Sequence, residues 1–569
     1  HVRHDHKALP GQRLRGADGL LIVGQQILGV PHDLDFHKIA AAQLPGVPAQ
    51  HAFHRQGVLD VVDAFYRDEA QAKAGGLQYS SAEENKAVDI SVRVGSVHTD
   101  NTHELKGTYT NASMVSKQMP LARQDSPALR NALWRGTQEA VEQAQQENNL
   151  VLSNKQVASE SVDTSDDFAL PQKNVFCQEE KPFVYDRAEI EARLKRLSLR
   201  GQKYAFADGA SFVFRLERTH IYFVDSMGSR IFTSRVLGRY MMSMHARNPD
   251  GMDLERNMIY DGVKAEDFPS EETMAADLDR MAQELKALKN APVVEPFTGP
   301  VILKNKASGV FFHEILGHRL EGHRQKSDAF GQTFTKKVGT QIVSPILSVS
   351  DNPRWEEFNG VPLRGHYLFD DEGNPAEDVP LIEKGILKNF LMSASPIKNF
   401  PKSNGHGRKS AGYRVVARMG NTVITPQVSM PYAQLEQKLL EEIKRQGKPY
   451  GLIIEDISGG FTMTDTSAPQ SFKVNPLLVY RVYPDGRKEV VRGVDLVGTP
   501  LASFSKVIAA GDDYAVFNGS CGAESGWVPV SAVSPSILVS EMEVEKVAKS
   551  PSKPPILRPP YTEKQKGGK

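Results

Sequence analysis

The sequence contains little cysteine, carries no net charge and has no long apolar run. Its two cysteines, Cys177 and Cys521, cannot form a disulfide framework, although one pair could form or a lone thiolate could bind a metal. Lysine plus arginine and aspartate plus glutamate balance at 69 each, so no overall field favours nucleic acid or a membrane surface. No apolar run approaches the ~18 residues that a membrane-spanning helix needs. These shortages exclude a disulfide scaffold, a charge-driven nucleic-acid binder and a membrane-spanning helix.

The remaining composition is typical of a soluble globular protein. The chain has 569 residues, of which 40% are apolar and 24% charged, and this length allows two to four domains with sizeable cores. The apolar stretch 20–30 is interrupted by two glutamines and makes a poor signal peptide. We therefore expect a cytoplasmic protein, and leave an exported form open because the sequence begins with His1 rather than methionine.

Changes of pattern along the chain divide it into five parts. Residues 1–75 show no clear periodicity and are left as a poorly defined segment, whereas residues 76–291 alternate between strand-like and helix-like patterns. Three prolines in residues 292–300 indicate a linker. Residues 301–548 are rich in strand patterns, and the Pro/Lys-rich tail at 549–569 is expected to be disordered.

Several elements can be placed from local signals. The alternation in residues 88–94 predicts a half-buried strand, and Pro127 begins a helix that we expect to end near residues 148–149. Asp186 and Ser270 are expected to cap two further helices. In the second half, strands are expected at residues 343–349, 385–392, 452–457 and 477–483, with one helix at about 432–445.

Two histidines and a glutamate occur within six residues, at His313, Glu314 and His318. Imidazoles bind Zn²⁺, and a carboxylate beside a ligand can take a proton from metal-bound water. The two histidines are five residues apart and would diverge by roughly 140° on an ideal helix, which is too far to share one ion. The helix must therefore end, bend or bulge, and Gly317 permits this. The alternative is a core helix with two incidental histidines.

The motif resembles a known family signature. His313-Glu314-x-x-Gly317-His318-x-x-Glu321-Gly322 is similar to the HExxxH signature of the TldD/PmbA metallopeptidase family, on its metal-bearing TldD side. Further family blocks follow in order at residues 367–373, 407–422, 457–460, 492–500 and 518–522. The resemblance covers about residues 80–548 and is strongest after residue 300.

The resemblance implies a fold and a site. The fold is α+β, with an N-terminal α/β domain followed by a curved, largely antiparallel β-sheet catalytic domain that carries the HExxxH helix. The family's zinc ligands fall on His313, His318 and Cys521, and its general base falls on Glu314. Two imidazoles and one thiolate leave a fourth position for water, as in catalytic rather than structural zinc sites.

The resemblance also implies an activity and partners. Family members cleave unfolded peptides with little sequence preference, as homodimers or as heterodimers with a metal-free paralogue. The alternative is a peptide-binding or accessory subunit with a structural metal site, which has no use for a base such as Glu314. A conventional zincin is excluded because its histidines are four residues apart.

Other polar residues near the motif have two interpretations each. Glu321 could hold the second nitrogen of a ligand imidazole, or be a solvated carboxylate at the end of the helix. His323 lies either behind the ligands or on the surface. Arg408, Arg414 and Arg418 could line a substrate groove by binding peptide carbonyls or a terminal carboxylate, or they could form structural ion pairs.

Three glycine-containing segments are also expected to be turns or loops. Gly519 and Gly522 flank Cys521 and suggest a tight loop that presents the sulfur, against the alternative of a small buried side chain. Residues 370–372 could bind Ca²⁺, but the following Gly373 favours a hairpin turn. Residues 458–460 are expected to be a glycine-rich turn beside a substrate cleft.

Overall fold

The computed structural model describes residues 54–104, 114–119, 127–156, 163–326, 333–462, 464, 472–498 and 504–547. The first 53 residues and the tail predicted at 549–569 lie outside the described residues. Within the described part, no helix is long and apolar enough to cross a membrane.

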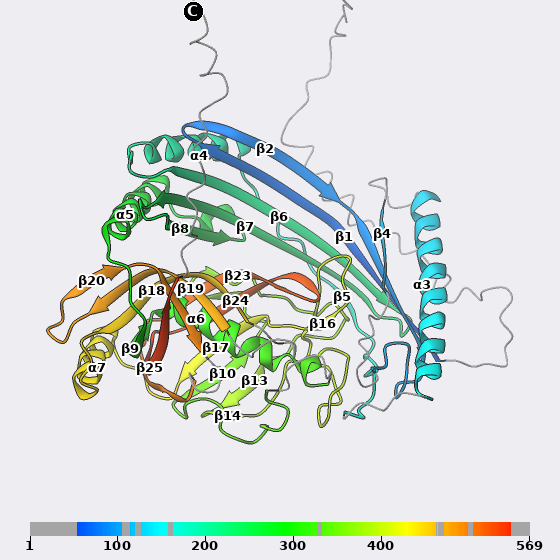
Figure 1. Cartoon of the computed structure of the whole chain (residues 1–569). Helices are drawn as coiled ribbons and strands as arrows, with labels where there is room; N and C mark the ends of the chain where they lie inside the picture. Colours follow the sequence, from blue (N-terminus) through cyan, green and yellow to red (C-terminus); the bar gives the residue numbers. More distant parts are fainter. Residues whose placement is uncertain are drawn as a thin grey trace, which may run out of the picture.

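The N-terminal half is built around one large sheet that arches over the rest of the molecule (Figure 1). Its strand order is β4-β3-β1-β6-β7-β5, with β2 paired to β1 and β8 paired to β7. All pairs are antiparallel except β5–β7. The strands are β1 (His54–Lys73), β2 (Gly76–Asn85), β3 (Ala87–Gly95), β4 (Met114–Gln118), β5 (Val175–Cys177), β6 (Gly209–Asp225), β7 (Arg230–Arg247) and β8 (Asp253–Gly262).

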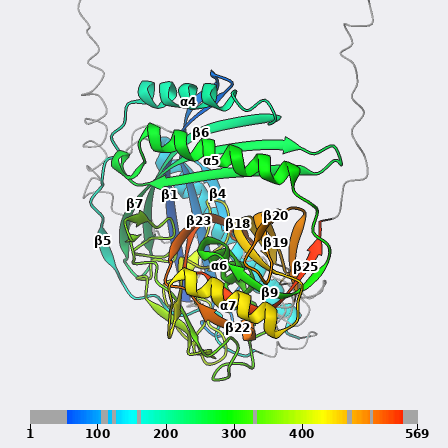
Figure 2. The same cartoon turned by 90° about the vertical axis from the view of Figure 1, so that its left-hand side faces the viewer.

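Three helices cover parts of this sheet. They are α3 (Pro127–Asn154), α4 (Arg187–Gly201) and α5 (Glu271–Asn290), with a short 3-10 turn, η1 (Ala265–Asp267), before α5. Asp186 caps α4 by accepting from two backbone N–H groups, and Ser270 caps α5 by accepting from Thr273. α3 packs on β3 and β4 at one end of the sheet, and α4 and α5 pack on the long strands at the other (Figures 1 and 2).

The first sheet of the C-terminal half closes on itself. Its order is β18-β9-β25-β21-β19-β20, β22 pairs with β25, and a further β18–β19 pairing joins the ends of a five-strand ring. α7 (Tyr432–Arg445) covers one side of this sheet. The strands are β9 (Phe297–Leu303), β18 (Gly451–Thr462), β19 (Phe472–Val482), β20 (Lys488–Val491), β21 (Val494–Gly498), β22 (Val507–Ala510) and β25 (Ile537–Lys546).

A second sheet of the C-terminal half has the order β14-β13-β10-β17-β24-β23. α6 (Asn305–Ile315) packs between the two sheets and contacts β18, β23 and β24. The strands are β10 (Leu347–Asp351), β13 (Val379–Glu383), β14 (Ile386–Leu387), β17 (Asn421–Pro426), β23 (Ala515–Ala523) and β24 (Gly526–Ser534), beside two short pairs, β11 (Glu357–Phe358) with β12 (Val361–Pro362) and β15 (Gly407–Arg408) with β16 (Val416–Ala417).

The structure changes two of the predicted boundaries. Strand β1 begins at His54, inside the stretch 1–75 for which the sequence shows no periodicity. Strand β9 begins at Phe297, inside the linker predicted at 292–300, because alternate residues of this strand pack on α6 and on α7. The longest curved antiparallel strands belong to the N-terminal half, whereas the resemblance placed the curved sheet in the catalytic half.

Candidate metal centre

The helix that carries the motif ends between its two histidines. α6 stops at Ile315, Leu316 serves as its C-cap, and a 3-10 turn, η2 (Gly317–Leu320), carries His318. A second 3-10 turn, η3 (Gly322–Gln325), follows directly. The change from α to 3-10 geometry alters the rotation per residue, so two histidines five positions apart can face the same point.

Gly317 is required by packing rather than by backbone conformation. A Cβ atom at this position would lie 2.0 Å from Sδ of Met419, and its φ is not in the left-handed region. We therefore expect Gly317→Ala to lower the free energy of unfolding by ~1–3 kcal/mol, because the new methyl group overpacks a buried contact. Urea unfolding measures this change. The matched control is Gly76→Ala, where the nearest atom to the added Cβ is 3.8 Å away; an equally small effect of both substitutions would contradict the packing account.

His313, His318 and Cys521 come together in the folded chain. One ligand atom from each of the three side chains lies within 4.8 Å of the others. Cys521 Sγ is 3.2 Å from His318 Nε2, and the two imidazole rings are 5.2 Å apart at their centroids. All three residues are buried. Of the described residues, they form the one group of three or more histidine, cysteine or acidic side chains arranged to hold a metal ion.

The donor set fits Zn²⁺. Zinc binds imidazole nitrogen at about 2.0–2.1 Å and thiolate sulfur at about 2.3 Å, so tetrahedral ligands stand about 3.3–3.7 Å apart. The spacing of the three side chains is close to this value. His313 Nδ1 is buried without a hydrogen-bond partner among the described residues, which is costly for a polar atom and is consistent with a site built to hold an ion.

The electrostatics of the cluster favour a positive charge at its centre. Burial alone would raise the pKa of the Cys521 thiol, but the two facing imidazoles hold it well below its usual value. Burial would lower the pKa of His318, yet the Cys521 thiolate and the Glu321 carboxylate raise it to about 10. The side chains thus stabilise a thiolate beside bound protons, and a divalent cation can replace those protons.

Glu314 directly follows His313 on α6. Its side chain is half-buried and forms no hydrogen bond or ion pair with another described residue. Its Cγ atom would lie 3.0 Å from a Cβ at Gly460 of β18, so this glycine leaves room for the carboxylate. Residues 458–460 therefore belong to a bulged strand rather than to the turn predicted from their glycines, with a register shift in the β18–β19 pairing between Ile457 and Gly459.

Glu321 joins His318 to two arginines. Its Oε1 lies 3.2 Å from His318 Nδ1, and its Oε2 accepts a hydrogen bond of 2.8 Å from Arg324 Nε. Arg418 Nε lies 3.3 Å from Glu321 Oε1. Burial would raise the pKa of Glu321, but His318 and the arginines lower it to about 2, so the side chain remains a carboxylate. This contact orients the His318 ring.

We expect Glu321→Gln to weaken metal binding by about 10- to 100-fold, because the amide holds the imidazole less strongly and leaves two arginines without their carboxylate. Competition with a chromophoric chelator measures the affinity. Glu442→Gln is the matched control, since Glu442 is also buried and pairs with an arginine but lies on α7. Equal metal affinity in the two variants would remove Glu321 from the site.

Cys521 lies in strand β23, opposite Val528, and not in the tight loop predicted from its flanking glycines. The glycines serve packing, because a Cβ at Gly522 would lie 3.0 Å from the Trp527 ring. Arg418 fixes this strand by donating to the backbone oxygen of Cys521 at 2.8 Å. Since Arg418 is fully buried, it lies behind the ligands and has no surface to offer a substrate.

The other two arginines of the predicted groove lie apart from Arg418. Arg408 donates to the carbonyls of Met419 and Pro529, and its guanidinium stands 4.7 Å from the centre of the Tyr367 ring. It lines a large cavity, whereas Arg414 lines a small one. The three arginines therefore do not form one groove.

Two residues of the centre were missed from the sequence. Glu524 accepts from Arg324 at 2.8 Å and lies 2.5 Å from His323 Nε2, so the half-buried His323 is held by this carboxylate. These contacts join η3 to the β23–β24 hairpin. Arg324 lies two positions after the motif and Glu524 three positions after Cys521, but no spacing rule connects them.

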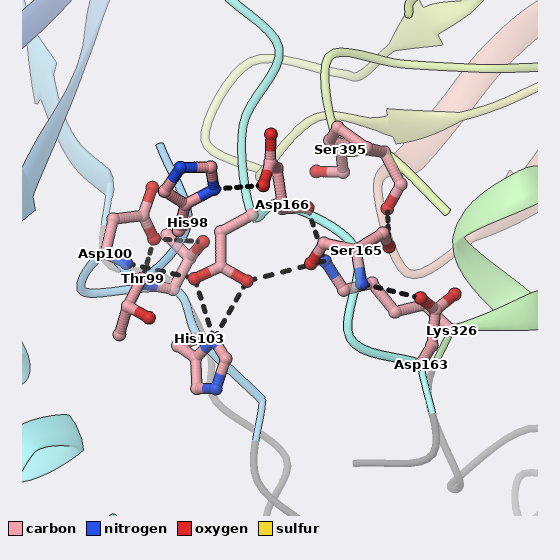
Figure 3. Close-up of polar contacts among 12 residues, drawn as sticks. His98, Thr99, Asp100, His103, Asp163, Ser165, Asp166, Lys326 and Ser395 are labelled. Carbon is pink, nitrogen blue, oxygen red and sulfur yellow. Dashed lines mark hydrogen bonds and ion pairs between the residues drawn. The ribbon is translucent and has the colours of Figure 1, made fainter. Parts of the chain in front are cut away.

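Lys326, just after η3, ties the motif to the N-terminal half (Figure 3). Its ammonium donates to the carbonyl of Asp166 at 2.8 Å and lies 3.4 Å from an Asp167 carboxylate oxygen. The same carboxylate group bonds His103 Nδ1 at 2.8 Å. The metal motif is therefore held by contacts from both halves of the chain.

The segment 370–372 is structural, because Asp370 accepts backbone N–H groups in a turn around Gly373.

Comparison with known proteins finds relatives that are named metalloproteases. The sequence model of the PmbA/TldA metallopeptidase C-terminal domain matches residues 297–546. A "Metalloprotease TldD homolog" of Buchnera aphidicola is 28% identical over 264 residues, which is 45% of this chain and 50% of the relative. A "Zinc metalloprotease TldD homolog" of Saccharolobus solfataricus is 27% identical over 43% of this chain and 51% of the relative. The chain thus spans about half the length of the curated relatives it matches.

Solved structures share the fold over most of the chain. A putative modulator of a DNA gyrase from Thermotoga maritima has a TM-score of 0.58 at 16% identity, covering 86% of this chain and 96% of its own. TldE from Thermococcus kodakarensis has a TM-score of 0.56 at 15% identity, covering 87% of this chain and 97% of its own. The mixed α/β architecture, with many strands and few helices, is therefore that of TldD/TldE-like proteins.

Proposed function

Because the chain belongs to the TldD/PmbA family through its C-terminal domain, we propose that it is a zinc-dependent peptidase that hydrolyses unfolded peptides. One observation carries the proposal. His313, His318 and Cys521 meet within 4.8 Å, and Glu314, the residue next to the first of them, forms no hydrogen bond with another described residue. The site thus combines three metal ligands with an available base.

The side chains have separate roles in this reaction. His313, His318 and Cys521 would hold Zn²⁺, which supplies a Lewis acid for water and for the substrate carbonyl. Glu314 accepts the proton of the attacking water and delivers it to the leaving amine. Glu321 keeps the His318 ring oriented, and Arg418 holds the backbone of Cys521 in place.

The arrangement favours a catalytic over a structural metal. A structural zinc site is closed by four protein ligands, whereas three gather here among the residues that the structure describes. An accessory subunit would also have no use for Glu314. Metal content measured together with peptide cleavage separates the two functions, because a structural site would bind zinc without turnover.

The position of Cys521 suggests how a peptide is held. β23, which carries this ligand, is the last strand of its six-stranded sheet. An extended peptide could add beside it and gain affinity from main-chain hydrogen bonds, which gives little sequence preference. In keeping with the family, we expect the active form to be a homodimer or a pair with a metal-free paralogue.

Strand addition admits only an extended chain, so unfolded proteins should be cut while their folded forms resist. We expect reduced, denatured substrates to be cleaved at many sequences, and the same proteins in native form to be cut at least about 10²-fold more slowly, because local unfolding must come first. Mass-spectrometric mapping of cleavage sites in a mixed peptide library measures the preference. One dominant residue at a single position, or rapid digestion of a stable folded control, would contradict strand addition.

A further inference from the structure

A cavity of about 690 Å³ lies between the large N-terminal sheet and the C-terminal half. Its walls include alternate residues of β6 and several residues of β7 on one side, and residues of β23, β24 and the segment 363–371 on the other. Ser520 lines this cavity, whereas its neighbour Cys521 belongs to the metal centre. Since successive side chains of a strand point to opposite faces, the Ser520 side chain points to the face of β23 opposite that of Cys521.

The walls carry an excess of positive charge. Eight lysines and arginines line the cavity against four carboxylates, whereas the whole chain is neutral. On the sheet, Arg215 of β6 stands directly opposite Arg239 of β7, and both side chains line the cavity. Like charges directly across a strand pair are destabilising. Each of the two is paired with a carboxylate outside the lining, Arg215 with Glu69 at 2.7 Å and Arg239 with Asp261 at 2.7 Å, so the excess is one of the lining residues alone.

Where the two walls meet, Arg364 has no carboxylate of its own. Arg239 and Arg364 share a single carboxylate, that of Asp261, at 2.7 and 3.2 Å. Glu217 stands 3.7 Å from Arg364 but is paired more closely with Arg67. The sheet and the C-terminal half thus meet through more guanidinium groups than carboxylates.

Two guanidinium groups of the C-terminal wall have bonding capacity left. Arg364 is only 7% exposed at its side chain, and its Nε has no hydrogen-bond partner among the described residues. Burial, together with the charge of Arg239, lowers the pKa of Arg364 to about 10. Arg408 forms no ion pair with any residue that the structure describes; it bonds two carbonyls and stacks on a ring. A buried donor without an acceptor is a costly feature that a bound anion would relieve.

We propose that this cavity binds a small polyanion that carries two or more carboxylate or phosphate groups. A guanidinium group binds either a carboxylate or a phosphate through paired charge-assisted hydrogen bonds. The site would therefore recognise the anionic oxygens that both groups present. The volume is that of a small-molecule site. Because arginines of both halves line the cavity, the ligand would bridge the N-terminal sheet and the C-terminal half.

The test is isothermal titration of the full chain with inorganic pyrophosphate and, separately, with propane-1,2,3-tricarboxylate at about 50 mM salt, where screening is weak. We expect saturable one-to-one binding of at least one probe and a rise in melting temperature. Arg364→Met and Arg235→Met, one from each wall, should each weaken binding at least about 10-fold. Arg354→Met is the control, because Arg354 is exposed and does not line the cavity.

A second control separates the cavity from the metal centre, since both probes can also bind zinc. Cys521→Ser should bind the probes as the wild type does. Binding of pyrophosphate alone would identify a phosphate ligand, and binding of the tricarboxylate alone a carboxylate ligand. No saturable binding of either probe, binding unchanged in both arginine variants while they remain folded by circular dichroism, or binding lost in Cys521→Ser would each overturn the proposal.

Discussion

Glu314→Gln is expected to retain zinc and to lose roughly 10²-fold or more of the rate of peptide hydrolysis. Glutamine has the size of glutamate but cannot accept a proton, so the metal ligands are untouched while the base is removed. The room left by Gly460 accommodates either side chain, and the fold should not change. Zinc content and kcat on an unfolded peptide are the two quantities to compare with the wild type.

Glu442→Gln provides the control for this experiment as well, because it makes the same chemical change in α7, away from the metal centre. It should keep both zinc and turnover. A Glu314→Gln variant that cleaves peptides at nearly the wild-type rate would show that another group takes the proton. The metal centre would then need a different base or would not be the catalytic site.

Cys521→Ser is expected to lose most of the bound zinc and, with it, at least about 10²-fold of the activity, while the chain remains folded. Serine is close to cysteine in size, but its hydroxyl group is a much poorer ligand for Zn²⁺ than a thiolate. The β23–β24 pairing and the contact of Arg418 with the Cys521 carbonyl involve only backbone atoms of this residue and should persist. Zinc per chain after dialysis and circular dichroism measure the two parts of the prediction.

The second cysteine supplies the matched control. Cys177 is exposed at the end of β5, so Cys177→Ser makes the same substitution outside the metal centre. It should retain zinc and activity. Near-stoichiometric zinc in Cys521→Ser would remove Cys521 from the ligand set and leave the two histidines to be completed by another residue.

Local sequence signals predicted many elements well. The helix expected at 432–445 is α7 with the same bounds, and Asp186 and Ser270 cap α4 and α5 as expected. These signals depend on residues close together in the chain. The end of α3 at Asn154, beyond the expected stop near 148–149, shows the limit of such signals, because Val151 is buried and extends the packed face.

The site was predictable only in part. Spacing alone shows that the helix must be interrupted between His313 and His318, and the structure places this change at Leu316. Cys521 is more than 200 positions away, so only the family resemblance joined it to the histidines. Its glycine neighbours suggested a loop because sequence does not reveal that Trp527 of the paired strand packs on Gly522 and Phe517 on Gly519.

Contacts between distant segments explain what the sequence could not give. Arg418 resembled a groove residue by its charge, but its partners, Glu321 and the Cys521 carbonyl, are brought to it by β23 and the 3-10 turns. Arg364 and Arg239 are likewise far apart in the chain and meet at Asp261. Local sequence patterns do not predict such pairs, because the type of one side chain does not identify the distant residue that it contacts in the folded chain.

The most direct measurement of the central claim is the zinc content of the purified chain together with its hydrolysis of unfolded casein, before chelation, after chelation and after zinc is restored. We predict one zinc per chain, loss of hydrolysis when the metal is removed and recovery when it is returned. Hydrolysis that persists in the zinc-free chain, or a chain with stoichiometric zinc that cleaves no unfolded peptide, would contradict it.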